Sequence, residues 1–332
     1  MSIRETLEAR ELQFLSPYAA KAAESRGRAR EEEPCEYRTC FQRDRDRIVH
    51  CKSFRRLKHK TQVFLSPEGD HFRTRLTHTL EVSQIARSVS RALGLNEDLA
   101  EAIALGHDLG HTPFGHAGER ALAKVMEGGF RHFEQSVRVA DKLEKGGVGL
   151  NLTWEVRDGI LNHTKGQWPA TLEGCIVRHA DRVAYIHHDM DDAIRAGVLK
   201  EGDIPHAVRA ELGETRGERL DTLVTDLIRN SGETIGFSAA KQEAFDELYH
   251  FMFQALYLNP TVKSDETKAD KLLLTLFEHF REDPNRLPAE AQVVAWQEGV
   301  DRAVADHIAS MTDNYAVQLY EELFIPRSWH TK

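Results

Sequence analysis

The chain has 332 residues, a formal net charge of −9 and 17 histidines, and hydrophobic residues make up 41% of it. This composition allows a large buried core and excludes a wholly disordered chain. No apolar run approaches the roughly 18 residues of a membrane-spanning helix, so we expect no membrane association, and the charged N-terminus predicts no secretory signal. The four cysteines lack Cys-x-x-Cys spacing, which favours free thiols in the cytoplasm over disulfides or structural zinc.

A basic segment interrupts this otherwise acidic chain. Residues 25–60 contain twelve lysines and arginines against six acidic residues. Such a segment either binds an anion, such as nucleic acid or nucleotide phosphates, or forms a solvated helix face with alternating salt bridges. The alternation of Arg and Asp over residues 43–47 is typical of the second, and composition alone does not decide between them.

Helical periodicity accounts for most of the chain. In chain order it predicts helices over 76–93, from a cap at Asn96 to about 109, over 117–127 and 133–145, from a cap at Thr153 to about 160, and over 172–195, 245–257 and 289–323. Residues 62–65 are the single short strand candidate. We therefore predict an all-α fold with an N-terminal basic segment (1–60), a helical core (61–200) and a C-terminal helical region (201–332).

The first chemical signal is His107-Asp108, at the end of an apolar helix and before a glycine-rich loop with two more histidines. Burying an imidazole and a carboxylate without partners costs several kcal/mol. A metal ion would satisfy both groups. A core histidine hydrogen-bonded to its neighbouring aspartate is the plainer interpretation, and for this pair alone it is favoured.

Two positions on other helices change that balance. His78 lies near the start of the first predicted helix, and Asp181 lies within the apolar helix over 172–195. Asp181, Tyr185 and Asp189 follow at i, i+4 and i+8 and so share one helix face. A histidine, a His-Asp pair and a separate aspartate can close on one metal. Their donor atoms suit Mn, Fe, Zn or Ni, and Mg less well.

These residues, in this order, resemble the H…HD…D signature of the HD-domain metal-dependent phosphohydrolases. Residues 37–48, 54–64, 73–78 and 106–116 further resemble the bacterial deoxyguanosine triphosphate triphosphohydrolases, over about residues 15–195 and more weakly over 325–329. The resemblance implies an HD-domain helical core with a C-terminal helical extension. It also implies a divalent metal, either Mg, Mn or another first-row ion such as Fe, Ni, Co or Zn.

The resemblance implies roles residue by residue. The matched metal ligands are His78, His107, Asp108 and Asp181. The matched substrate contacts are Arg75 for the phosphates, Gln62 for base and sugar, and Tyr185 and Asp189 for sugar and phosphates. The matched catalytic residues are His111, His116 and His132. Where the family usually has His-Asn-x-Gln, this chain has His-Phe-Glu-Gln, so Glu134 is either the partner of His132 or a solvated acid in a first helical turn.

The implied reaction is hydrolysis of a deoxynucleoside triphosphate (dNTP) to the deoxynucleoside and inorganic triphosphate, with His116 or His132 as the proton donor. The resemblance further implies a homo-oligomer, a nucleotide activator at a second site and regulation by single-stranded DNA. Two alternatives stay open. One is an HD phosphohydrolase for a nucleoside monophosphate, a cyclic nucleotide or an alarmone, and the other is a regulator that binds nucleotides or single strands without catalysis.

Overall fold

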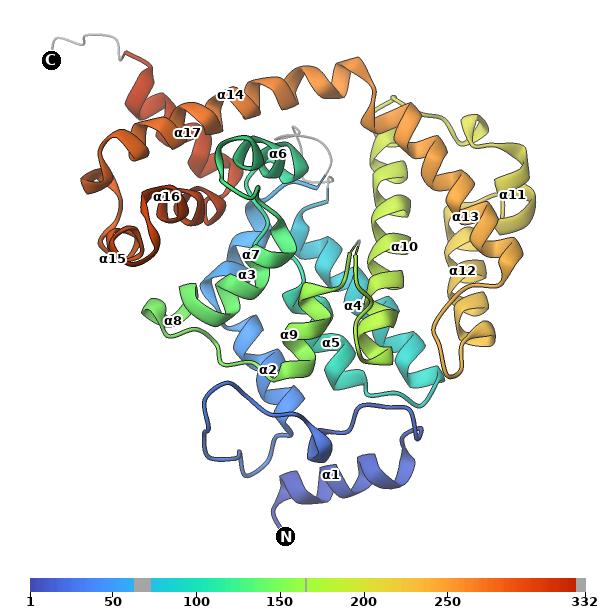
Figure 1. Cartoon of the computed structure of the whole chain (residues 1–332). Coiled ribbons are helices and arrows are strands. Elements are labelled where there is room, and N and C mark those ends of the chain that lie inside the picture. Colours follow the sequence, from blue (N-terminus) through green and yellow to red (C-terminus); the bar gives the residue numbers. More distant parts are fainter. Residues whose placement is uncertain (63–72, 165, 327–332) are drawn as a thin grey trace, which may run out of the picture.

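The computed structural model describes residues 1–62, 73–164 and 166–326, which form helices and their connections (Figure 1). Within these ranges there is no β-strand, and extended pairing is limited to isolated bridges between Arg28 and Thr153 and between Thr61 and Thr74. The predicted all-α fold is confirmed. The strand candidate over 62–65 lies outside the described residues except for Gln62, as does most of the motif at 325–329.

The helices follow one another along the whole chain. The α-helices are α1 (Ile3–Phe14), α2 (Cys40–Val49), α3 (Lys52–Arg56), α4 (Arg75–Ala92), α5 (Glu97–Gly106), α6 (Gly115–Val125), α7 (His132–Arg138), α8 (Glu144–Gly147), α9 (Trp154–Leu161), α10 (Leu172–Arg195), α11 (His206–Leu212), α12 (Arg216–Asn230), α13 (Ala239–Met252), α14 (Pro260–Glu282), α15 (Ala289–Glu298), α16 (Val300–Ala309) and α17 (Asp313–Phe324). Short 3-10 helices are η1 (Ala22–Glu24), η2 (Leu57–His59), η4 (Glu201–Asp203) and η6 (Pro284–Arg286), and π-helices are η3 (Val139–Leu143) and η5 (Phe253–Tyr257).

Local capping explains several helix starts. Asn96 caps α5 as predicted, because its side-chain oxygen accepts a hydrogen bond from the backbone N of Leu99 at 3.1 Å. Thr153 occupies the N-cap position of α9, as predicted, but its side chain does not cap the helix. The backbone N and the hydroxyl of Thr153 both donate to Oδ2 of Asp44 at 2.7 Å, so the side chain is directed away from α9. The region predicted over 289–323 is divided into α15, α16 and α17, with a break at Gly299, whose φ is +98°.

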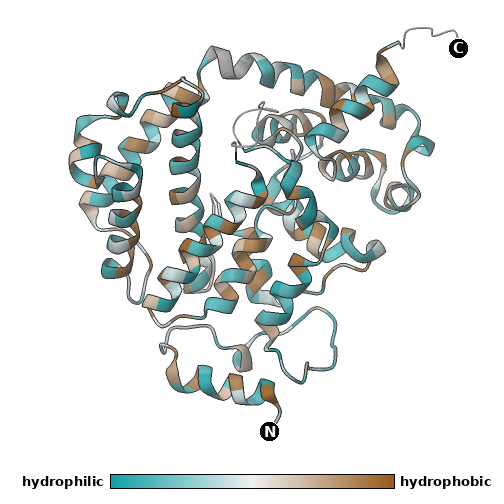
Figure 2. Ribbon diagram, turned by 180° about the vertical axis from the view of Figure 1, so that it is seen from behind, coloured by the Kyte–Doolittle hydropathy of each residue, from teal (hydrophilic) through white to brown (hydrophobic). Residues whose placement is uncertain are grey.

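The larger hydrophobic core surrounds α4, α5 and α10 and extends to α12 and α13. Brown, apolar positions alternate with teal ones along these helices, as expected for amphipathic helices packed in a bundle (Figure 2). The 24-residue α10 runs through the middle of this core, so side chains several turns apart on it reach different parts of one site. None of the helices in the described ranges combines the length and apolar character needed to cross a bilayer.

A second hydrophobic core joins the C-terminal region to α6. It combines buried residues between 114 and 130 with buried residues between 269 and 316. The long α14 crosses from α13 to this second core, where it packs against α6, α16 and α17, and α15 packs against α16 (Figure 1). The C-terminal helices therefore support the segment that follows the histidine-rich loop. The domain boundaries expected at residues 60 and 200 stay predictions.

Candidate active site

Two helix ends bring the first group of site residues together. The Thr74 side chain caps α4, which places Arg75 and His78 in the first turns of that helix, and both side chains are buried. His107 and Asp108 follow directly after α5. The chain then passes so close to α7 that a Cβ on Gly110 would lie 2.2 Å from the backbone N of Ser136, so glycine is required there.

The four residues expected to bind metal converge in the structure. Nε2 of His78 lies 3.1 Å from Oδ1 of Asp181, and Nε2 of His107 lies 3.8 Å from the same oxygen. Nε2 of His107 also lies 3.6 Å from Oδ1 of Asp108. These residues come from α4, the end of α5 and α10, and every side chain is at most 17% exposed.

This donor set fits a divalent cation. Nδ1 of His107 lies 2.6 Å from the backbone O of Ala104, which leaves Nε2 buried and without a hydrogen-bond partner among the described residues. Burial opposes ionisation of Asp108 and Asp181, but the neighbouring histidines, together with Arg75 in the case of Asp108, outweigh it and hold the pKa of both carboxyls below the usual range. Two ionised carboxylates and an imidazole lone pair in a buried site are what a divalent ion requires.

Arg75 lies beside this group. Its guanidinium donates to Oδ2 of Asp108 at 2.7 Å, and both side chains are almost fully buried. Nε of Arg75 has no hydrogen-bond partner within the described ranges. The contact fixes the guanidinium next to the candidate metal ligands, where it can also neutralise an anionic substrate.

A second group of residues lies next to the first and contains the three predicted catalytic histidines. His111 stacks on His132 with ring centroids 4.6 Å apart and an interplanar angle of 18°. His116 lies 5.2 Å from His111 and 5.8 Å from His132 by the same measure. Donor atoms, one from each of these histidines and one from Glu119, lie within 4.8 Å of one another, so the group could also approach a cation. The nearly parallel rings of His111 and His132 direct their in-plane lone pairs side by side, which favours proton transfer over metal binding.

The structure places Glu119 beside His132, a position for which Glu134 was one candidate. Oε1 of Glu119 lies 3.0 Å from Nδ1 of His132, and Oε2 lies 2.9 Å from Nδ1 of His116. Glu134 instead pairs with Arg131 and its side chain is 54% exposed, because the first turn of α7 directs it to solvent. Sequence reasoning missed Glu119, although the i, i+3 spacing from His116 on α6 was a usable signal.

Opposite pKa shifts distinguish His132 from His111. Burial disfavours the charged form of His132, but the hydrogen bond and negative charge of Glu119 outweigh it and raise the pKa. Burial and the positive charge of Arg75 hold the pKa of His111 well below its usual range. His132 is therefore the better candidate for a protonated imidazole near neutral pH.

His163, at the end of α9, connects the two groups and was not predicted. Its Nε2 lies 3.3 Å from Nε2 of His132, and its ring centroid lies 4.9 Å from that of His107. Burial, together with the neighbouring histidines, lowers the pKa of His163 to about 3, so it is neutral. No sequence pattern marks this residue, because it follows an ordinary helix and stands alone.

The expected sugar contacts lie further along α10. Tyr185 is partly buried, and burial raises its pKa. Asp189 is buried, accepts a hydrogen bond from the hydroxyl of Tyr257 in η5, and has a pKa raised by burial to about 7. Oε1 of Gln62 is buried and has no partner among the described residues. Tyr257 was missed because it lies 68 positions beyond Asp189.

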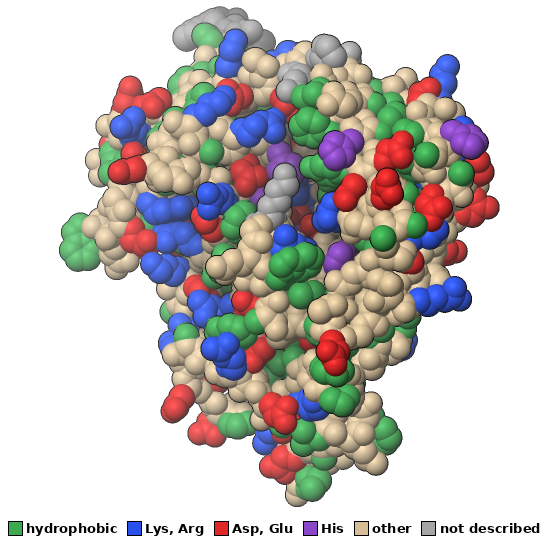
Figure 3. Space-filling view, turned by 45° about the vertical axis from the view of Figure 1, so that its right-hand side comes forward, with side chains coloured by type: hydrophobic (Ala, Val, Ile, Leu, Met, Phe, Trp, Pro, Cys, Tyr) green, Lys and Arg blue, Asp and Glu red, His purple; other side chains and the backbone are tan. Residues whose placement is uncertain are grey.

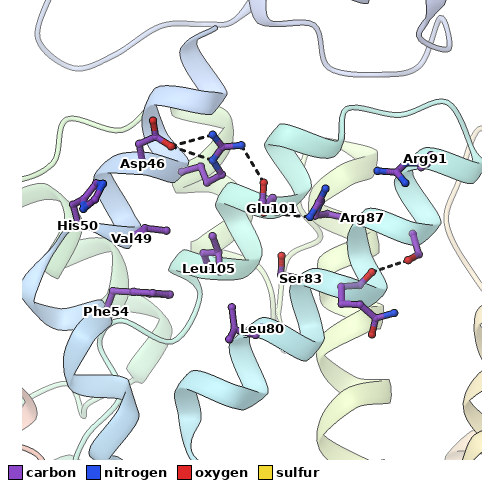
Figure 4. A pocket seen from close by; sticks show the side chains of 13 residues that line it. Asp46, Val49, His50, Phe54, Leu80, Ser83, Arg87, Arg91, Glu101 and Leu105 are labelled. Atoms are coloured by element: carbon purple, nitrogen blue, oxygen red, sulfur yellow. Dashed lines mark hydrogen bonds and ion pairs between the residues drawn. The ribbon is translucent and has the colours of Figure 1, made fainter. Parts of the chain in front are cut away.

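Histidine and acidic side chains are visible in a hollow on one face of the molecule, which basic side chains border (Figure 3). The basic segment forms a different surface. Arg45 pairs with Asp46, Asp98 and Glu101 beside a pocket of about 570 Å³ between α2, α4 and α5 (Figure 4). Arg28 likewise pairs with Asp44. The arginines of α2 are thus engaged in ion pairs, as the second interpretation of this segment predicts, but Asp44 is buried and does not belong to a solvated face.

Family models match two parts of the chain. The HD domain matches residues 75–186, which contain the metal-ligand candidates, and the phosphohydrolase-associated domain matches residues 235–322. A solved phosphohydrolase from Bacteroides thetaiotaomicron shares the fold with a TM-score of 0.53 and 19% identity, over 83% of this chain and 68% of that chain. The fold and the site therefore define an HD-domain phosphohydrolase.

Comparison with curated relatives shows which family of HD-domain phosphohydrolases the chain belongs to. A deoxyguanosinetriphosphate triphosphohydrolase-like protein from Caldanaerobacter subterraneus is 58% identical over 331 residues, which cover 99% of this chain and 98% of the relative. Proteins of the same name from Desulfatibacillum aliphaticivorans and Clostridium perfringens are each 48% identical over 98% of this chain and 99% of the relative. The chain belongs to the deoxyguanosinetriphosphate triphosphohydrolase-like family.

Proposed function

We propose that this protein hydrolyses dNTPs to the deoxynucleoside and inorganic triphosphate with a divalent metal. The single observation that carries the proposal is that the candidate metal ligands lie next to the histidine group around His132. A buried set of metal donors adjoins a histidine whose pKa Glu119 raises, and His163 lies between them. The names of the relatives, at up to 58% identity, support the substrate class.

The metal would be held by His78, His107, Asp108 and Asp181, and Mg, Mn, Fe, Ni, Co and Zn are the candidate ions. When bound, it would supply Lewis acidity to the substrate phosphate and lower the pKa of water. The guanidinium of Arg75 lies beside Asp108, next to the proposed metal position, and balances the negative charge on the phosphate oxygens.

The second group, formed by His111, His116 and His132 with Glu119, carries out the proton transfer. His132, kept protonated by Glu119, donates its proton to the departing 5′-oxygen, which completes cleavage between the α-phosphorus and that oxygen. His116 shares the Glu119 carboxylate and can help to hold it in place. His111 is held neutral, so it offers a hydrogen bond to the phosphates without adding a charge.

Sugar and base recognition falls to α10 and its neighbours. Tyr185 lies one helical turn beyond Asp181 and packs under the sugar, where a ribose 2′-hydroxyl would meet the ring. Asp189 and Tyr257 offer polar groups to the far side of the sugar. The buried amide oxygen of Gln62 is available to the base or sugar.

The test is incubation with each of the four dNTPs and Mn or Mg, singly and mixed, with chromatography of the products. We expect the deoxynucleoside and triphosphate, and in ¹⁸O water the label on the former α-phosphate. Pyrophosphate with a monophosphate would place the scissile bond elsewhere. Turnover of cyclic nucleotides or alarmones alone would replace the substrate class, and binding without turnover would leave a regulator.

Three properties of the assembled enzyme stay predictions from the resemblance. They are activation by a nucleotide at a second site, regulation by single-stranded DNA, and assembly into a homo-oligomer. Turnover that requires a mixture of dNTPs would support an activating site. Light scattering at several protein concentrations measures the oligomer, and the salt dependence of single-strand binding counts the phosphate contacts.

A further inference from the structure

A C-terminal aspartate contacts the loop that carries the catalytic histidines. Asp313 begins α17 and is 2% exposed. Its Oδ2 accepts hydrogen bonds from the backbone N of Thr61 at 2.9 Å and from the Thr61 hydroxyl at 2.6 Å. Its Oδ1 accepts a hydrogen bond from the backbone N of Phe114 at 2.9 Å. One buried carboxylate thus joins α17, the segment before Gln62 and the loop between His111 and His116.

The backbone of Phe114 has an unfavourable conformation, which surrounding contacts must maintain. Its φ of 60° and ψ of 26° lie in the left-handed region, which is unfavourable for a bulky side chain. Phe114 immediately precedes α6, the helix that carries His116 and Glu119. The direction in which α6 leaves the loop therefore depends on contacts that hold Phe114, and Asp313 provides one of them.

A buried lysine makes a second connection to the same loop. Lys60 is 2% exposed, and its Nζ donates to the backbone O of Ala309, at the end of α16, at 2.8 Å. The same amine donates to the backbone O of His111. Burying an amine carries a large desolvation cost, so its two carbonyl contacts hold both backbone segments firmly.

We propose that Lys60 and Asp313 are positioning residues, which hold the segment 111–119 so that His111, His116 and Glu119 meet His132. The C-terminal helices then complete the proton-donating side of the active site rather than only covering it. The effect on catalysis rests on the proposed function, whereas the effect on the loop does not. The two are therefore tested by different measurements.

The variants are Asp313→Asn and Lys60→Met. An amide at position 313 can accept from Thr61, but its NH2 then faces the N–H of Phe114 and that hydrogen bond is lost. Methionine fills the space of Lys60 without donating. Thr312→Ala is the matched control, because Thr312 caps the same helix through the backbone N of Tyr315 at 3.3 Å and, among the described residues, makes no hydrogen bond to the loop. Thr61→Val, which removes one hydroxyl contact, is the milder variant if Asp313→Asn does not fold.

Amide hydrogen exchange of the full chain is the first readout. We expect exchange over residues 110–118 to rise roughly tenfold in Asp313→Asn and Lys60→Met, less in Thr61→Val, and not at all in Thr312→Ala. Wild-type rates in the two main variants, or an equal rise in the control, would overturn the proposal. This result does not depend on the substrate.

Steady-state kinetics with the best dNTP is the second readout. We expect kcat to fall roughly tenfold in the two main variants. KM and metal content should stay near wild type, because contacts other than those of Lys60 and Asp313 hold the candidate metal ligands in place. A loosened loop with wild-type kcat would show that the contacts do not position the catalytic group. Absence of dNTP turnover in the wild type would instead refute the proposed function and leave the exchange result standing.

Discussion

The carboxylate of Glu119 contacts the imidazole of His132, with Oε1 at 3.0 Å and Oε2 at 3.2 Å from Nδ1. Oε1 also accepts a hydrogen bond from the backbone N of His132 at 2.9 Å. The ring and the start of α7 are therefore fixed by one side chain of α6. This contact, and not one with Glu134, raises the pKa of His132, the residue that we propose as the proton donor.

Glu119→Gln should move the alkaline limb of the kcat–pH profile to lower pH. A raised pKa keeps His132 protonated to higher pH, and the acid-catalysed rate falls as pH rises through that pKa. Without the negative charge, burial lowers the pKa and the fall begins earlier. At pH 8 we expect kcat to drop by about 100-fold or more.

Glu134→Gln is the matched control for that variant. Its side chain is 54% exposed and pairs with Arg131, so the profile should match that of the wild type. A shift in Glu134→Gln with none in Glu119→Gln would reverse the two assignments.

Asp108→Ala should lose both bound metal and hydrolysis. The carboxylate is buried beside His107 and Arg75, and its removal deletes one anionic donor while leaving the guanidinium uncompensated. Elemental analysis of the purified variant gives the metal content. Asp191→Ala, which removes a partly exposed carboxylate paired with Arg73, should keep its metal. Full occupancy in Asp108→Ala would refute the ligand assignment.

Tyr185→Ala should reduce the preference for dNTPs over NTPs. If the ring excludes a ribose 2′-hydroxyl or leaves it unpaired, the wild type should prefer dNTPs about tenfold to hundredfold in kcat/KM. The variant should show a smaller ratio with unchanged metal content, because Asp181 lies one turn away.

His132→Ala provides the contrasting result for the same assay. It should lower kcat for every dNTP and leave the dNTP/NTP ratio unchanged, because the proton donor serves all substrates. An unchanged ratio in Tyr185→Ala together with wild-type kcat in His132→Ala would remove both roles and leave the metal site.

Glu173→Gln should stabilise the fold at alkaline pH. Oε1 of Glu173 accepts hydrogen bonds from the backbone N of Ala20 at 3.0 Å and of Asn96 at 2.9 Å, and burial raises its pKa from 4.5 to about 7. The stability linked to its neutral form is present below about pH 4.5 and is lost as pH rises through 7. Gln keeps the acceptor without the charge.

Urea unfolding at two pH values measures this effect. The variant should exceed the wild type by roughly 1–3 kcal/mol at pH 8 and by much less at pH 5. An equal difference at both pH values would show that the carboxyl does not titrate between them in the folded protein.

Much of the fold was readable from local sequence. The spacing of apolar residues predicted α4 and α10 nearly to the residue, and Asn96 marked the start of α5, because amphipathic faces and caps are properties of neighbouring residues. The motif around His107 and its likeness to a known family led to the four candidate metal ligands, which the structure brings within hydrogen-bonding or near-contact distances.

Only the tertiary structure decided which groups meet those donors. Glu119 rather than Glu134 reaches His132 because α6 brings the Glu119 side chain to the start of α7, whereas the sequence left Glu134 as either the partner of His132 or a solvated acid. His163, Tyr257 and Asp313 approach the site from α9, η5 and α17, at sequence separations that no periodicity records. Caps and helix faces arise from interactions between residues a few positions apart, so the local sequence determines them. The partners of a buried charge depend instead on how distant helices pack.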